Sequence, residues 1–464
     1  MPRPSVTYRC TDCGWSSTRW VGRCAQCEAW GTVGEDASGG PRGRAGGSAV
    51  APALPMPEVD PAAGQAVPSG VDELDRVLGG GLVPGGVVLL AGEPGVGKST
   101  LALEVAARAP GPALYLTGEE TTAQVRRRAD RTGAVHPALF LAAVRDLEEV
   151  LVHLDRVRPG LLVLDSVQTV TVPGVDSSAG GPAQVRAVTS ALVGAAKRTG
   201  TSVLLVGHVT KDGSVAGPRV LEHLVDVVLV FEGDRHSRLR LLRGLKNRFG
   251  PADEVGCLDL EEGGIRSVPD PSRLFLSHNP EAVPGRCWTV ALEGRRALPI
   301  EVQALLGPPG EGPSRRVTTG LPPSRLALLL AVLEQRCRLP IGGRDVYTAT
   351  VGGLAVAEPA ADLAVALAVA SATTGLALPA GVTAVGEVGL DGEVRAVGGL
   401  RHRVLEAARV GARRVLVPEA EQAGGAAALP DVEGCEVVSV RTLDDALRRA
   451  AGSASLRLVQ PSRS

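Results

Sequence analysis

The sequence predicts an α/β protein of 464 residues in which a parallel sheet binds a nucleotide. Between residues 67 and 270, apolar stretches of strand length alternate with helical stretches, which is typical of a parallel sheet covered by helices. A cysteine cluster precedes this region, and a second α+β region follows it. We expect a cysteine module at 1–35, a flexible linker at 36–66, the nucleotide-binding domain at 67–270, an α+β domain at 271–456 and a tail at 457–464.

Composition excludes several classes of protein. Hydrophobic residues make up 44% of the chain, enough for folded cores, and the net charge of −1 argues against a polybasic tail. A nucleic-acid site would therefore be a local patch. We find neither an apolar run long enough to span a bilayer nor the apolar core of a signal peptide, so we expect a cytoplasmic protein without a membrane partner.

Four cysteines near the N-terminus form two pairs, Cys10 with Cys13 and Cys24 with Cys27. Each C-x-x-C turn supplies two thiolates, and two such turns can close a tetrahedron around Zn²⁺. Four protein ligands leave no open coordination position, so the predicted zinc site is structural, and disulfides are disfavoured in a reducing compartment. Trp15 is expected to pack over this site, whereas Trp20 could either do the same or contact a base or a partner.

The segment from residue 92 to residue 100 fits the P-loop pattern G-x-x-x-x-G-K-[ST] and lies between an apolar strand and a predicted helix. Its backbone amides and the helix N-terminus would hold phosphates, Lys98 would reach the β- and γ-phosphates, and Ser99 would ligate Mg²⁺. We therefore predict ATP and Mg²⁺ as ligands. The predicted nucleotide-binding residues are Gly92, Glu93, Pro94, Gly95, Val96, Gly97, Lys98, Ser99 and Thr100.

Acidic residues follow two of the predicted strands, where ligands of parallel sheets bind. Asp165 ends the strand Leu161–Asp165 and is the candidate for holding the Mg²⁺ shell, as in a Walker B motif. Glu119 and Glu120 follow the strand Ala113–Thr117. We predict that Glu119 is the base that activates water, with Glu120 supporting it or taking its place.

Two further features follow later strands. His208 comes directly after the predicted strand Ser202–Gly207 and could sense the γ-phosphate, although an ordinary loop histidine is the alternative. The basic segment of Lys246, Asn247, Arg248, Phe249 and Gly250 lies far from the P-loop in the sequence. It could reach a neighbouring subunit's γ-phosphate, contact DNA phosphates, or form a solvated hairpin.

With these motifs, the chain resembles the bacterial RadA (Sms) family of RecA-like DNA-repair ATPases. The four-cysteine motif, the P-loop preceded by residues 74–81, the segment Lys246–Gly250 and the C-terminal region carry the resemblance, which covers nearly the whole chain. It implies a RecA-like core in a homohexameric ring that threads single-stranded DNA, action on branched DNA and RecA recombinase as a partner. By the same analogy, Lys246 and Arg248 act across a subunit interface or couple ATP to DNA.

The C-terminal region resembles the proteolytic domain of Lon, notably at Gly398-Gly399-Leu400 and at Arg414–Pro418. Lon-type proteolysis needs a serine nucleophile and a lysine base. Ala360 stands where the serine is expected, and Arg401 stands where we expect the lysine. Alanine has no nucleophile and arginine stays protonated, so peptidase activity is not expected. Arg401, His402 and Arg403 are instead candidates for a DNA-contacting patch or a solvated helix start.

These features suggest three functions. The leading one is a DNA-dependent ATPase, a helicase-like motor of recombinational repair that binds single-stranded DNA and promotes branch migration. A scaffold that binds ATP and loads recombination proteins without processive motor activity is the alternative. An ATP-dependent protease is disfavoured because both members of the dyad are replaced.

Overall fold

The computed structural model describes residues 8–10, 13, 15–17, 21–27, 29, 33–35, 53–208, 221–233, 238–277, 281–310, 313–419 and 430–450. The chain divides into two units, Met1–Pro61 and Ala62–Ser464. The predicted linker up to residue 52, the predicted tail, and the side chains of Trp20 and Trp30 lie outside the described residues.

The N-terminal unit contains a small antiparallel sheet in the order β2-β1-β3, formed by Ser16–Ser17, Tyr8–Cys10 and Val33–Glu35. Its buried residues are Cys10, Cys24 and Val33, with Trp15 packed against them as expected. A cluster this small buries too little apolar area to hold a fold, so an additional staple such as a metal ion is needed. Two short 3-10 helices follow, η2 (Met56–Glu58) and η3 (Pro61–Gly64).

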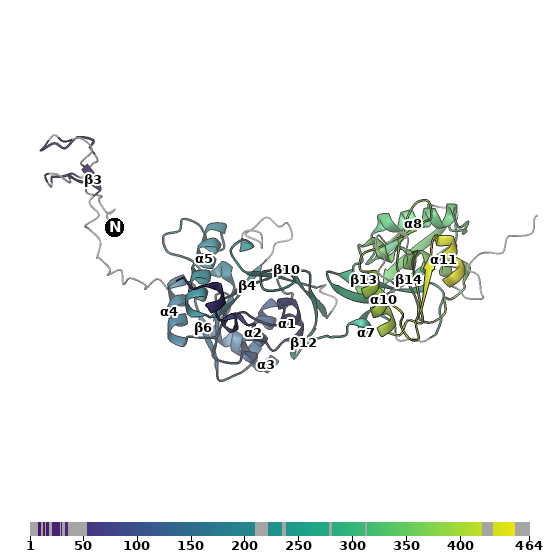
Figure 1. The fold of residues 1–464 in the computed structure, drawn as a ribbon, viewed down its shortest axis with the longest axis horizontal. Helices are drawn as coiled ribbons and strands as arrows, with labels where there is room; N and C mark the ends of the chain where they lie inside the picture. The colour runs from purple at the N-terminus through teal and green to yellow at the C-terminus, as the bar shows by residue number, and fades with distance from the viewer. Residues whose placement is uncertain are drawn as a thin grey trace, which may run out of the picture. The chain divides into compact units, whose positions relative to one another are not determined.

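A nine-stranded sheet forms the centre of the next region, in the order β12-β11-β10-β9-β4-β8-β7-β5-β6 (Figure 1). The six strands from β9 to β6 in this order are parallel, and β10, β11 and β12 extend the sheet in antiparallel fashion. The prediction of a mostly parallel sheet is confirmed. The strands are β4 (Val87–Gly92), β5 (Ala113–Thr117), β6 (Leu139–Ala143), β7 (Leu161–Asp165), β8 (Ser202–His208), β9 (Val227–Glu232), β10 (Leu239–Asn247), β11 (Val255–Glu261) and β12 (Gly264–Ser267).

Helices cover both faces of this sheet because its central strands are apolar on both sides. One core contains side chains of α1 (Asp72–Leu78), α2 (Lys98–Arg108) and α3 (Thr122–Thr132). The opposite core contains those of α4 (Leu147–Val157), η4 (Val167–Thr169) and α5 (Pro182–Thr199). Local chemistry sets the ends of these helices: Thr121 and Gln124 form a capping box that starts α3, and Gly133 in the left-handed conformation ends it.

A seven-stranded mixed sheet forms the C-terminal region, in the order β15-β16-β14-β13-β17-β20-β21. Helices α8, α9 and α11 pack on one face and α10 packs on the other. The strands are β13 (Arg286–Glu293), β14 (Arg296–Pro309), β15 (Arg316–Thr319), β16 (Arg344–Thr350), β17 (Val382–Ala384), β20 (Arg414–Pro418) and β21 (Glu436–Val440), and β18 (Glu387–Val388) pairs separately with β19 (Val394–Arg395). The helical segments are α7 (Ser272–Phe275), α8 (Pro323–Gln335), η5 (Val351–Gly353), η6 (Pro359–Ala361), α9 (Asp362–Thr374), α10 (Leu400–Arg409) and α11 (Leu443–Ala450).

No helix among the described residues combines the length and the apolar character needed to cross a bilayer.

A buried ion pair joins the nine-stranded region to the seven-stranded region. The Arg296 guanidinium, at the start of β14, contacts the carboxylate of Glu73 in α1, and both side chains are at most 8% exposed. Arg296 also donates to the carbonyls of Val255, Val268 and Pro269. The Glu73 oxygen that meets Arg296, Oε2, also accepts a hydrogen bond of 2.7 Å from the backbone amide of Cys257. These bonds satisfy both charges inside a continuous core.

Replacing Arg296 by methionine should destabilise the chain by about 3–5 kcal/mol, because the buried charge of Glu73 would keep only the half-exposed Arg76 as an ion-pair partner. The double variant Arg296→Met, Glu73→Gln should recover part of this loss, since it removes the buried charge that has lost its buried partner. Denaturant midpoints measure both effects. Arg126→Met is the control, because Arg126 forms an exposed pair with Asp130 and should change stability by less than about 1 kcal/mol. Equal losses at the two arginines would contradict the prediction.

Candidate nucleotide-binding site

The P-loop leaves the carboxyl end of β4, the middle strand of the nine-stranded sheet, and leads directly into α2. Gly92 has a φ of 159°, and a Cβ at this position would lie 2.3 Å from the carbonyl oxygen of Phe231. Gly95 and Gly97 have φ values of 81° and 111°, a conformation that other residues adopt only with strain. Glycine at these positions therefore allows the loop to curl over the end of the sheet.

Lys98 opens α2 and is 4% exposed. Its ammonium donates to the carbonyls of Gly92 and Glu93, both at 2.8 Å. Burial lowers the pKa of Lys98, while the negative charges of Asp165 and Glu119 act in the opposite direction. The sequence-predicted lysine and the two sequence-predicted carboxylates thus lie close enough to interact electrostatically.

Asp165 ends β7 and is 6% exposed. Its Oδ2 accepts a hydrogen bond of 2.5 Å from the hydroxyl of Tyr115, a fully buried residue of the neighbouring strand β5. The backbone carbonyl of Asp165 accepts from the amide of Gly118, which begins the loop after β5. A buried carboxylate beside a P-loop helix is a suitable donor for a Mg²⁺ shell.

Glu119 lies in the loop after β5 and faces two polar groups from neighbouring strand ends. Its Oε1 accepts from the Ser166 hydroxyl at 2.6 Å and lies 2.9 Å from Nε2 of His208. Partial burial opposes the charge of Glu119, but the hydrogen bonds from Ser166 and His208 and the charges of His208 and Lys98 outweigh it and lower the pKa. Glu119 is therefore held ionised at the edge where Lys98 and Asp165 also lie.

Glu120 points to a different partner. Its carboxylate forms a salt bridge of 2.5 Å with Arg128 of α3. Its backbone amide donates a hydrogen bond to the hydroxyl of Thr117. The two adjacent glutamates are thus separated by their contacts, Glu119 toward Ser166 and His208, and Glu120 toward α3. This arrangement favours Glu119 over Glu120 as the residue that meets a nucleotide.

The segment Lys246–Gly250 lies at the opposite edge of the sheet. Asn247 pairs with Val227, and Val227 pairs with Val88, whereas the P-loop begins at Gly92. Four strand residues separate these levels, which corresponds to about 13 Å. The basic segment is therefore not next to the nucleotide site of its own chain.

Its two basic side chains differ in their contacts. The Lys246 ammonium donates to the carbonyls of Glu222 and Val225, at 2.5 and 2.9 Å, and so is used within its own chain. The Arg248 side chain is 52% exposed and contacts Asp226 at 3.1 Å. The amide of Asn247 donates to the carbonyl of Leu78, and Phe249 is 43% exposed. Arg248 and Phe249 are the members of the segment that remain accessible at the surface.

In the C-terminal region, Arg403 rather than Arg401 meets the loop that carries Ala360. Arg403 is 2% exposed, and its guanidinium binds both carboxylate oxygens of Glu358, at 2.6 and 2.7 Å, as well as the carbonyls of Val290 and Gly398. Arg401 is exposed. Residues two apart project about 200° from each other on a helix, so only one of them can face the core. The expectation that Arg403 could join Arg401 and His402 in an exposed basic patch is therefore wrong, because Arg403 is buried.

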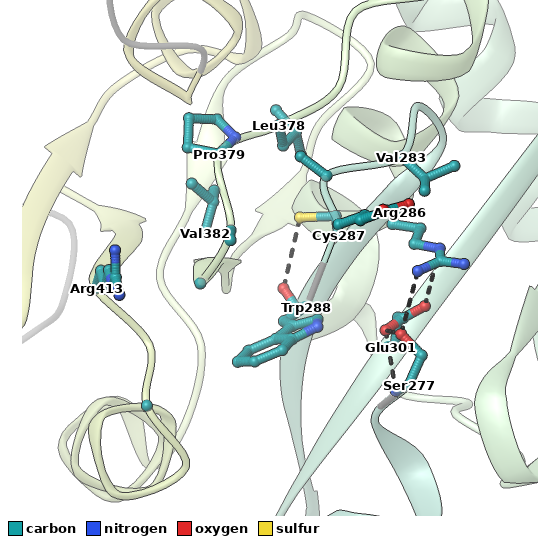
Figure 2. Close-up of a pocket in the computed structure, with 15 residues that line it drawn as sticks. Ser277, Val283, Arg286, Cys287, Trp288, Glu301, Leu378, Pro379, Val382 and Arg413 are labelled. Atoms are coloured by element: carbon teal, nitrogen blue, oxygen red, sulfur yellow. Dashed lines mark hydrogen bonds and ion pairs between the residues drawn. The ribbon is translucent and has the colours of Figure 1, made fainter. Parts of the chain in front are cut away.

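A hollow of about 350 Å³ lies elsewhere in the C-terminal region, beside the first residues of β13 and β17 and the interior of β14 (Figure 2). Arg286 on its wall is tied to the buried carboxylate of Glu301, which also accepts from the amide and hydroxyl of Ser277. Trp288, Val382 and Arg413 face the same space. None of the predicted site residues lines this hollow, so it is separate from the candidate nucleotide-binding site.

The four N-terminal cysteines have the geometry of a metal site. All four Sγ atoms lie within 4.8 Å of one another, with Cys10 and Cys27 3.7 Å apart and Cys13 and Cys24 3.5 Å apart. Zinc–sulfur bonds of about 2.3 Å in a tetrahedron require sulfur separations of about 3.8 Å. The thiolates therefore fit a tetrahedral ion such as Zn²⁺.

Models of three known domain families match the chain. Residues 63–214 match the AAA domain, residues 350–452 match the C-terminal proteolytic domain of Lon protease (S16), and residues 8–35 match the rubredoxin metal binding domain. The three matches agree with the P-loop, the C-terminal fold and the cysteine cluster described above.

Whole-chain relatives are more specific. A DNA repair protein RadA of Mycolicibacterium smegmatis is 53% identical over 424 residues, covering 89% of this chain and 91% of the relative. The chain belongs to the RadA family of DNA repair proteins. RadA of Mycobacterium tuberculosis is 52% identical over 89% of this chain and 88% of its own length, and RadA of Bacillus subtilis is 39% identical over 97% and 100%. The resemblance to RadA, together with the fold class, is confirmed.

Sequence reasoning missed two residues of this RadA site, Tyr115 and Ser166. Tyr115 is the middle residue of an apolar strand, where an aromatic side chain is ordinarily part of the core. Ser166 directly follows Asp165, and its position after a strand end was the available signal. Their hydrogen bonds depend on pairing between strands that are about 50 residues apart in the chain.

Purified protein should contain one tightly bound metal ion for each chain, and Cys24→Ser should lose it, because three thiolates and a hydroxyl no longer match the soft tetrahedral site. Elemental analysis after dialysis against a chelator measures this. Cys435→Ser, at a buried cysteine of the C-terminal region, is the matched control. Retention of the metal in Cys24→Ser would contradict the assignment.

Proposed function

We propose that this RadA-family protein is a DNA-dependent ATPase, a helicase-like motor that binds single-stranded DNA and promotes branch migration of recombination intermediates. The convergence of Lys98, Glu119, Asp165 and His208 at one edge of the sheet carries the proposal, because this set can both bind and hydrolyse a nucleoside triphosphate. The DNA repair names of the relatives support the choice of DNA as the partner.

Each residue has a task in hydrolysis. The amides of residues 92–100 hold the phosphates, and Lys98 moves its ammonium from the loop carbonyls to the β- and γ-phosphates. Ser99 and Asp165 hold Mg²⁺, which neutralises charge on the phosphates when bound. Glu119, kept ionised by its neighbours, orients and deprotonates the attacking water. His208, at the end of β8 and in contact with Glu119, senses the γ-phosphate.

The basic segment couples this site to other molecules. Lys246–Gly250 lies about 13 Å along the strands from the P-loop, so a contact with a nucleotide would come from a neighbouring subunit in a homohexameric ring. Within the segment we assign this contact, or one with DNA phosphates, to Arg248, because its side chain is half exposed, whereas the part-buried ammonium of Lys246 donates to two carbonyls of its own chain. RecA recombinase is the proposed protein partner, by resemblance to the family.

The C-terminal region does not act as a peptidase in this proposal. Ala360 provides no nucleophile, and Arg401, which stands where the lysine base is expected, stays protonated. A scaffold that binds ATP and loads recombination proteins without processive motor activity is the second candidate. The ionised Glu119 beside the P-loop favours hydrolysis over the scaffold, because a scaffold needs no base.

Glu119→Gln should lower the rate of ATP hydrolysis about 100-fold or more while nucleotide binding persists, because the amide cannot accept a proton. Glu120→Gln is the matched control and should retain most of the activity, since Glu120 is paired with Arg128. Steady-state turnover and binding of a fluorescent ATP analogue measure the two properties, with Lys98→Ala expected to weaken both. A greater loss in Glu120→Gln would reverse the assignment, and unchanged turnover in Glu119→Gln would favour the scaffold.

Single-stranded DNA should stimulate hydrolysis, with binding that weakens steeply as salt rises, because phosphate contacts release counterions. Arg248→Ala should abolish this stimulation. The rate of ATP hydrolysis that a dilute sample shows without DNA should be mostly retained. The control is Arg198→Ala, which changes another exposed arginine, at the end of α5. DNA-independent turnover in the unmodified protein would sink the proposed motor, whereas normal stimulation of Arg248→Ala would sink only the role of Arg248.

A further inference from the structure

We propose that two buried hydroxyls, those of Tyr115 and Ser166, are positioning residues that give the two carboxylates of the nucleotide site their separate tasks. Tyr115 fixes Asp165 for the metal, and Ser166 fixes Glu119 for water. The inference rests on the proposed ATPase function and adds two residues to it.

Tyr115 is placed to orient Asp165. It is fully buried in β5, between β7 and β6, and its ring belongs to the core shared with α2 and α3. Its hydroxyl reaches Oδ2 of Asp165 at 2.5 Å, a length typical of a strong bond between a hydroxyl and a carboxylate. Burial and the charge of Asp165 raise the pKa of Tyr115 well above its usual value, so the hydroxyl remains a donor. A rigid ring therefore fixes the plane of the Asp165 carboxylate.

Ser166 holds Glu119 in a different direction. Its side chain is fully buried, and its hydroxyl donates to Oε1 of Glu119 at 2.6 Å. The loop that carries Glu119 has little freedom to move away, because Gly118 packs against Thr169, where a Cβ would lie 1.8 Å from the Thr169 hydroxyl. Thr169 in turn donates to the carbonyl of Ser166. The base and its donor are thus held by the same short segment, residues 165–169.

Each hydroxyl contacts the carboxylate that belongs to the other strand and its following loop. Tyr115 precedes Glu119 in the chain yet contacts Asp165, whereas Ser166 follows Asp165 yet contacts Glu119. This crossed pattern ties the loops after β5 and β7 together and keeps the two carboxylates from sharing one donor. Two carboxylates that shared a proton or a cation could not act separately as metal holder and base.

A purely structural role is the alternative explanation, since a buried hydroxyl needs an acceptor. That role affects stability alone. A positioning role affects two functional properties, and it affects a different one at each residue. Removing the Tyr115 hydroxyl should therefore change the Mg²⁺ dependence of nucleotide binding, whereas removing the Ser166 hydroxyl should change kcat.

For Tyr115, the test is binding of a fluorescent ATP analogue at increasing Mg²⁺ concentration. Tyr115→Phe should raise the Mg²⁺ concentration needed for half-maximal binding by about 10- to 100-fold, as is typical when the partner of a metal-holding residue is removed. Binding without Mg²⁺ should not change. Tyr347→Phe is the matched control, because Tyr347 is exposed and contacts Asp345 at 3.3 Å in the C-terminal region.

For Ser166, the test is the division of the effect between kcat and KM. Ser166→Ala should lower kcat about 10-fold or more with unchanged KM and unchanged Mg²⁺ dependence of binding. It should have little further effect in a Glu119→Gln background, because the residue it positions has already lost its function. Ser202→Ala is the matched control: Ser202 is also buried, and its hydroxyl donates to the carbonyl of Val83 at the other edge of the sheet.

Lower stability of Tyr115→Phe with unchanged Mg²⁺ dependence would overturn the role of Tyr115. Full additivity of Ser166→Ala and Glu119→Gln would overturn the role of Ser166. Thermal denaturation of each variant separates these outcomes from a failure to fold. If the unmodified protein showed no Mg²⁺-dependent nucleotide binding, the proposed ATPase function would fail first, and that result is distinct from either of the others.

Discussion

The register of the parallel strands is the constraint on which the candidate site depends. Gly92 lies opposite His208, and Thr117 lies opposite Asp165. Because β4, β5, β7 and β8 all run in the same direction, their carboxyl ends meet at one edge, and every polar side chain after a strand is brought there. A slip of one residue in any of these strands would turn its last side chain to the other face of the sheet.

The same edge separates groups that are adjacent in the chain. Glu119 and Glu120 are consecutive, yet one contacts Ser166 and His208 while the other contacts Arg128 of α3. The close packing of Gly118 against Thr169 holds the start of this loop beside η4. Glu119 then faces Ser166, directly before η4, and Glu120 faces Arg128 of α3. The two glutamate side chains are chemically identical, and only their position in the fold gives them different environments.

The sequence was sufficient for the parts of the fold that local patterns encode. The P-loop, the strand ends that carry Asp165 and His208, and the paired cysteines follow from short-range spacing. It was insufficient for contacts between side chains that are far apart in the chain. The hydrogen bond from Tyr115 to Asp165 and the ion pair of Glu73 with Arg296 join residues about 50 and about 220 positions apart, and periodicity contains no information on such partners. The grouping of Arg403 with Arg401 and His402 in one exposed patch was wrong for a related reason, since it depended on which face of α10 is buried.

The contact of Arg403 with Glu358 limits which substitutions this region can accept. The buried guanidinium is bound by the carboxylate of Glu358 and by the carbonyls of Val290 and Gly398. A lysine at position 403 would keep a positive charge, but it would break the bidentate ion pair and could not reproduce the planar set of donors. The first turns of α10 are therefore committed to arginine at this position, and charge in this helix can vary freely only at exposed neighbours such as Arg401.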